Sequence, residues 1–182
     1  ATTYFLNGSG NIAAAVRTSS IVSNLFFGIL TGGKNISGAD TIFIGNDAGA
    51  NNISASKNTF LGSKAGNKTT IGGSNTFVGN NSGINNISGQ INLFLGNDSG
   101  LQNTSGSFNT YVGSSAGGSS NSGNSNTMLG ISAGLANTGN SNTFLGGSAG
   151  GGFASNTDGV LIGDGSQSFA DNQTNFIAIG KG

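Results

Sequence analysis

The segment from Gly28 to Asn35 is the part of the chain that comes closest to a known ligand-binding or catalytic motif. Its sequence, GILTGGKN, follows the phosphate-binding pattern GxxxxGK[ST] up to the last position, where Asn35 replaces the hydroxyl residue that binds magnesium. No helical pattern follows the lysine, and a repeat along the chain already accounts for Gly28 and Gly32. A nucleotide-binding site is therefore not expected at this segment.

Most of the residue types that carry acid–base and nucleophilic chemistry are absent. The chain has no histidine, cysteine or glutamate, which excludes a histidine base, a reactive thiolate and a histidine-ligated zinc. Asp47 and Asp98 share a repeat position three coils apart. At about 4.8 Å per coil they are about 14 Å from each other, too far for a catalytic carboxylate pair. We expect a protein that is not an enzyme.

A calcium site formed by Asp158, Asp164 and Asp171 is the one metal site that the acidic residues suggest. Aspartate in glycine-rich turns more often forms local turn hydrogen bonds or is solvated, and that interpretation is preferred here. We expect neither a metal nor a cofactor.

These residues are positioned by a repeat that spans nearly the whole chain. An anchor glycine recurs every 17 residues, with one step of 16, and closes a short apolar run each time. A fixed period of this length is typical of a solenoid, in which each repeat forms one coil. The anchors are Gly28, Gly45, Gly62, Gly79, Gly96, Gly113, Gly130, Gly146, Gly163 and Gly180.

Each coil has the same pattern around its anchor. The residue before the anchor is always large and aliphatic or aromatic, and the residue two before it is aromatic in most coils. Such residues favour a strand, and the glycine permits a turn after it. A weaker second strand is expected in segments such as 35–38, 52–54 and 86–89, and asparagine four residues before most anchors is expected to form a hydrogen-bonded ladder.

The pattern predicts an all-β parallel β-solenoid of about ten 17-residue coils, with almost no helix. Residues 1–23 depart from the repeat and are expected to form an irregular N-terminal cap or assembly segment. Residues 24–182 form the predicted repeat domain.

Composition narrows the classes of partner. Charged residues make up 7% of the chain, and six basic residues balance six acidic ones, so no basic stripe exists to bind nucleic acid. No apolar run is long enough for a membrane helix, so membrane insertion is not expected. The low net charge gives little protection against self-association.

Both faces of the predicted strand are apolar, which leads us to expect self-association. One face can fill the coil, and another chain must then cover the other. The end motif at 176–180 has no visible cap, and the apolar start of the chain could cover such an edge on a neighbour. The expected assembly residues are Tyr4, Phe5, Leu6, Phe43, Phe60, Phe77, Phe94, Tyr111, Phe144, Phe176, Ile177 and Ile179.

The segments FIAIG at 176–180 and NTFLG at 142–146 resemble the head repeats of YadA-like trimeric autotransporter adhesins. They are also similar to the NTFxGxxAG repeats of phage tail fibres and large bacterial surface proteins. The resemblance covers about residues 24–180 and implies a left-handed β-roll, usually trimeric, with a fibre or adhesive role. The chain departs from it in its 17-residue period and in phenylalanine where the heads usually have a small residue. The same resemblance assigns the column of Ile44, Leu61, Leu95 and Leu145 to the coil interior and turns the phenylalanine column towards another chain.

We expect a structural, self-associating subunit or segment of an extracellular, cell-surface or virion fibre. Its partner would be another copy of itself, in a homo-oligomer (a trimer included) or a filament. An adhesin head or host-recognition shaft that binds surface glycans is the alternative. Ice binding by the threonine column is a more distant one, because leucine at position 93 interrupts that column. Threonine also shares a strand face with the aliphatic column, which predicts that it points inward.

Overall fold

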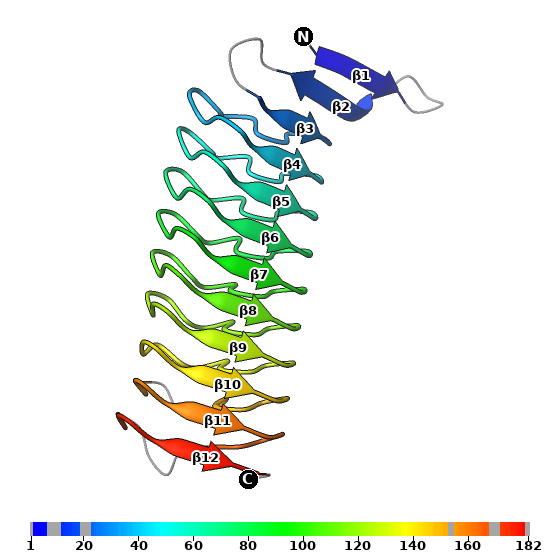
Figure 1. Cartoon of the computed structure of the whole chain (residues 1–182). Helices are drawn as coiled ribbons and strands as arrows, with labels where there is room; N and C mark the ends of the chain where they lie inside the picture. The colour runs from blue at the N-terminus through cyan, green and yellow to red at the C-terminus, as the bar shows by residue number, and fades with distance from the viewer. Residues whose placement is uncertain (1, 7–11, 19–22, 153–154, 168–171, 181–182) are drawn as a thin grey trace.

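The computed structural model shows a stack of coils that runs the length of the repeat region (Figure 1). It describes residues 2–6, 12–18, 23–152, 155–167 and 172–180. The described residues contain strands and turns and no helix. The predicted parallel β-solenoid is confirmed.

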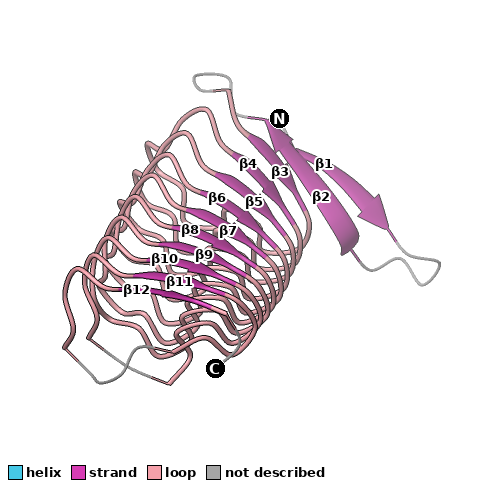
Figure 2. Ribbon diagram, turned by 60° about the horizontal axis from the view of Figure 1, so that its bottom comes forward, coloured by secondary structure: helices cyan, strands magenta, loops and turns pink. Residues whose placement is uncertain are grey.

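Ten short strands form one parallel sheet along the side of the stack, one strand per coil (Figures 1 and 2). Their partners are in strict register, so that equivalent residues of successive coils lie side by side. The strands are β3 (Leu25–Phe27), β4 (Ile42–Ile44), β5 (Thr59–Leu61), β6 (Thr76–Val78), β7 (Leu93–Leu95), β8 (Thr110–Val112), β9 (Thr127–Leu129), β10 (Thr143–Leu145), β11 (Val160–Ile162) and β12 (Ile177–Ile179).

The expected second strand of each coil does not form. Residues 35–38 and their equivalents are turns and bends, although their backbones still bond from coil to coil. The N–H groups of Ile36 and Ser37 both donate to the carbonyl of Ile53 at 3.0 Å. Because one acceptor serves two donors, this side of the coil is hydrogen-bonded without being a regular strand.

The phenylalanine column fills the interior of the coil. Phe43, Phe60, Phe77 and Phe94 have no exposed surface, and successive rings stack with centroids 4.7–4.9 Å apart. The assignment of this column to an interface is therefore wrong, and so is the inward assignment of the aliphatic column. Tyr111, Met128, Phe144 and Leu161 continue the buried column.

Small residues across the coil explain why the rings point inward. The third residue after each anchor is alanine, serine or threonine and is buried, and the fourth is glycine in eight coils. At Gly66, a Cβ atom would overlap the ring of Phe60. Only the interior therefore offers a cavity of aromatic size, and it is lined by backbone and small side chains.

The predicted asparagine ladder is confirmed. The backbone N–H of Asn75 donates to Oδ1 of Asn58 at 2.8 Å, and that of Asn92 donates to Oδ1 of Asn75 at 2.9 Å. The amide of Asn75 also donates to the carbonyl of Gly89 at 2.9 Å. The ladder satisfies buried polar groups that would otherwise destabilise the interior.

The N-terminal part differs in its strand directions. β1 (Thr2–Leu6) pairs antiparallel with β2 (Ile12–Thr18), and β2 pairs antiparallel with β3. β2 therefore covers the N-terminal edge of the parallel sheet within the same chain (Figure 1). Tyr4, Phe5 and Leu6 lie in β1, and their role in covering a neighbour's edge stays a prediction.

Candidate functional site

The candidate site is the outward surface of the parallel sheet, here called the strand face. It consists of the first and third residues of each strand from β3 to β12, because the middle residue points into the coil. Leu61 is 45% exposed and Leu95 is 43% exposed. Ile177 and Ile179, two of the expected assembly residues, are 71% and 75% exposed on β12.

The strand face is apolar and carries no charge. Its third-residue column is aliphatic except for Phe27, and its first-residue column has threonine in five strands and an aliphatic residue in the other five. Ten strands at about 4.8 Å give a length of about 43 Å, and residues two apart in a strand lie about 7 Å from each other. With side chains the footprint is roughly 500 Å², near the upper end for an apolar patch on a soluble monomer. An apolar patch of this size on a soluble monomer is often functional.

The threonine column lies on this outward face. Thr59, Thr76, Thr110, Thr127 and Thr143 are partly exposed, so the expected inward position is wrong. Period-two alternation placed threonine and the aliphatic column on one face correctly, but that face is the outer one.

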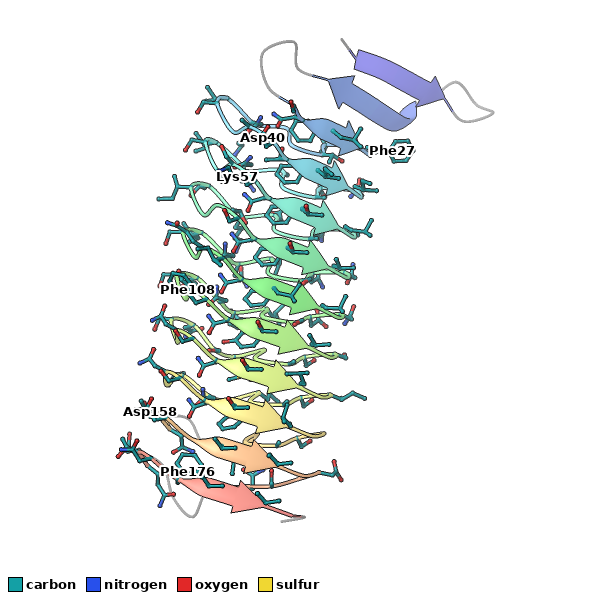
Figure 3. All side chains as sticks on the ribbon, in the orientation of Figure 1. Phe27, Asp40, Lys57, Phe108, Asp158 and Phe176 are labelled. Atoms are coloured by element: carbon teal, nitrogen blue, oxygen red, sulfur yellow. The ribbon has the colours of Figure 1, made fainter. Side chains whose placement is uncertain are left out.

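Charged residues lie along the two rims of the strand face. The upstream rim is the residue two before each strand, and it carries Asp40, Lys57 and Asp158, which Figure 3 shows along one edge of the stack. The downstream rim consists of the first two residues after each anchor glycine. It carries Asp47, Lys64, Asp98 and Asp164.

The expected assembly residues of the aromatic column and Phe176 pack in the interior of the coils. Phe43, Phe60, Phe77, Phe94, Tyr111 and Phe144 form the buried column. Phe176 lies at the position of the asparagine ladder and packs against the core beside Gly159, where a Cβ would overlap its ring. Sequence reasoning therefore missed the true outward residues, such as Leu61, although it had placed them in one column.

The segment that resembles a phosphate-binding loop is part of the first coil. The N–H of Gly32 donates to the carbonyl of Ala48 and the N–H of Lys34 to that of Ala50, both at 3.0 Å. Amides that hold the next coil cannot also cradle a phosphate. This geometry removes the remaining support for a nucleotide site.

The acidic residues do not gather into a metal site within the described part of the chain. Asp158 lies on the upstream rim and Asp164 on the downstream rim, on opposite sides of β11. Asp171, the third expected ligand, lies outside the described residues.

Tyr111 is the one described ionisable group with a resolved pKa shift. Burial raises its pKa to about 12, while side-chain hydrogen bonding with Ser120 and Asn126 acts in the opposite direction. Its hydroxyl donates to Oγ of Ser120 at 3.2 Å, and Ser120 stands where most other coils have asparagine. The shorter serine leaves room for the phenol oxygen. The pair therefore serves packing in the coil interior and does not mark a reactive site.

The same replacement leaves Oδ1 of Asn103 without a hydrogen-bond partner. In the earlier coils, Nδ2 of Asn52 donates to Oδ1 of Asn35 at 2.9 Å. We expect Tyr111→Phe to lower the free energy of unfolding by about 1–2 kcal/mol, because Ser120 loses its partner. Adding Ser120→Asn should recover it, because the new amide can donate to Asn103. Urea unfolding followed by circular dichroism measures both.

The raised pKa gives this prediction a pH dependence. The folded state favours the neutral phenol, so the contribution of Tyr111 is complete below about pH 10 and is lost as the pH rises towards about 12. The difference in unfolding free energy between Tyr111→Phe and the wild type should shrink over that range. An unchanged difference would contradict the buried position of the phenol.

None of the described residues forms a helix that is long and apolar enough to cross a membrane. Comparison with protein-family models, curated protein sequences and solved structures gave no match. The fold and the strand face define the class: a parallel β-solenoid repeat protein with an uncharged apolar outer face. Glycan binding and an extracellular location stay predictions.

Proposed function

We propose that this chain is a self-associating structural subunit or segment of an extracellular or virion fibre. The observation that carries the proposal is the strand face, an uncharged apolar surface that continues over ten strands. Water solvates such a surface poorly, and contact with another copy would remove it from water. The phenylalanine stack already fills the coil, so this face is available for a partner.

The resemblance to adhesin heads and tail-fibre repeats supports this role. The FIAIG segment at 176–180 and the NTFLG segment at 142–146 carry it, and the solenoid is compatible with it. We infer a fibre or shaft role from that resemblance, and the expected homo-oligomer would form through the aliphatic columns.

Charges placed on the strand face should separate the copies without unfolding them. We expect Leu61→Asp with Leu95→Asp to raise the dissociation constant by a factor on the order of a hundred or more, because two unpaired carboxylates would be buried per copy. Both side chains point outward, so the coil interior is unchanged. Analytical ultracentrifugation over a range of concentrations measures the dissociation constant, and circular dichroism checks the fold.

The matched control places the same charges elsewhere. Ile36 and Ile53 are exposed in the turns between strands, and Ile36→Asp with Ile53→Asp should leave association unchanged. If the Leu61 and Leu95 variant associates like the wild type, the strand face is not the interface.

Ice binding is a second candidate that the structure favours more than the sequence did. The threonine side chains are partly exposed and lie side by side in register from coil to coil. A monomer that slows ice growth, and loses this activity on Thr110→Tyr, would support ice as the partner instead of another copy.

A further inference from the structure

We propose that two copies associate through their strand faces with their solenoid axes antiparallel, so that β5 of one copy faces β11 of the other. This inference rests on the proposed function, because it concerns the same surface, and it specifies the orientation of the partner. The rim charges select this orientation, and the composition of the strand face agrees with it.

The rim charges disfavour an arrangement in which the solenoid axes are parallel and the coils are in register. Whether two or three copies face a common axis, the upstream rim of one copy then lies beside the downstream rim of the next at the same coil. Asp40 would meet Asp47, Lys57 would meet Lys64, and Asp158 would meet Asp164. All three pairs are like charges, and like-charge contacts suppress an arrangement.

Antiparallel axes remove these contacts. A two-fold axis parallel to the strands places upstream rim on upstream rim and reverses the order of the coils. With β8 at the axis, Lys57 faces Asp158 on the upstream rim, and Lys64 faces Asp164 on the downstream rim. The two-fold repeats both contacts, so four opposite-charge pairs frame the interface. A shift of one coil would instead place Asp40 opposite Asp158.

The residues at the axis support the same register. Phe108 and Ile91 occupy the upstream rim at positive φ, +62° and +55°, a region that bulky and β-branched residues avoid. Other coils have polar residues at this position. Phe108 is 59% exposed, and in the proposed pair it meets Phe108 of the other copy. The same position has positive φ in every coil from β4 to β12, so the fold imposes this backbone, and a bulky side chain there costs stability unless a contact uses it.

The first residues of the facing strands match at three of the five levels, and the other two levels place an aliphatic residue opposite threonine. β6 faces β10, so Thr76 meets Thr143, and β4 faces β12, so Ile42 meets Ile177. Leu93 meets Thr127 across β7 and β9. The strand face itself brings no charge into the interface, because none of the residues of β3 to β12 is charged.

Fluorescence resonance energy transfer between labelled single-cysteine variants tests the orientation. The chain has no cysteine of its own, so each label attaches only at the introduced position. Ile36, 82% exposed, precedes β4, and Asn175 precedes β12. In the proposed pair, a donor on Ile36→Cys lies at the same level along the axis as an acceptor on Asn175→Cys of the other copy. Two labels at Ile36→Cys lie eight coils apart along the axis, about 38 Å. We expect high transfer for the mixed pair and low transfer for the Ile36→Cys pair.

Charge reversal on the rim gives an independent test, because the antiparallel and parallel arrangements predict opposite changes in the dissociation constant. In the antiparallel pair, Lys57→Asp places a carboxylate opposite Asp158, and the dissociation constant should rise roughly tenfold at low salt. Adding Asp158→Lys should restore it. In the parallel arrangement, the new carboxylate would meet Lys64 and association would tighten.

The outcomes separate the two proposals. Higher transfer for the Ile36→Cys pair, or tighter association of Lys57→Asp, overturns the antiparallel orientation and leaves the self-associating face intact. A chain that stays monomeric, or a Leu61→Asp with Leu95→Asp variant that associates normally, overturns the strand face as the interface and the orientation with it.

Discussion

Phe77→Ala should lower the free energy of unfolding by about 3–5 kcal/mol, because it opens a cavity in the middle of the aromatic stack. The ring of Phe77 has no exposed surface and stacks on Phe60 and Phe94 at 4.9 and 4.8 Å. No neighbour can fill the space, since the opposite wall is glycine and serine. Urea unfolding followed by circular dichroism measures the loss.

Leu95→Ala is the matched control, because it also removes a large apolar side chain but from the outward face. Measured on dilute monomer, it should cost less than about 1 kcal/mol. Equal losses for the two variants would contradict the inward position of the phenylalanine column. By the same reasoning, Phe60→Asp with Phe77→Asp should unfold the chain instead of releasing soluble monomers.

Gly66→Ala should destabilise the fold by about 2–5 kcal/mol, because two costs combine. Gly66 has φ +57°, which a residue with a Cβ resists, and its Cβ would overlap the ring of Phe60. The same glycine recurs in eight coils, each beneath the residue of the buried column. Thermal unfolding should show a clear decrease in the midpoint.

Gly165→Ala separates the two costs. Gly165 has φ +67°, but no atom lies within 4 Å of its Cβ position. The substitution should therefore cost only about 1 kcal/mol, the conformational part alone. If Gly165→Ala and Gly66→Ala are equally destabilising, overlap with the ring does not explain the recurring glycine.

The repeat pattern was enough to predict the parallel solenoid, its register and its ladder of asparagines. Stacking equivalent positions at the coil spacing requires only the period, so Asn58, Asn75 and Asn92 align without further information. Residues such as Gly62 mark the turn because φ of +142° excludes other residues there.

The second strand could not be predicted in this way. Segments such as 52–54 have β-branched residues and coil-to-coil hydrogen bonds, but their backbone turns too tightly for a strand. Local propensity does not reveal how sharply a coil must bend to close around a single ring.

The closed coil decides which face of the strand points inward. Alternation assigns Thr59 and Leu61 to one face and Phe60 to the other, and both faces are apolar enough to be buried. The interior holds one ring per coil only because Ala65 and Gly66 come from the far side of the same turn. That contact joins residues in different parts of the coil, so only the tertiary structure decides it.

The sequence by itself therefore determined the fold class, the register, the spacing of every column and the absence of histidine and cysteine chemistry. The tertiary structure decided that phenylalanine is core, that the aliphatic and threonine columns are surface, and that Lys57, Lys64, Asp158 and Asp164 frame that surface. The physical reason is that a period fixes which residues stack along the axis. The closure of each coil, which depends on side-chain volume across its interior, fixes which of them meet water.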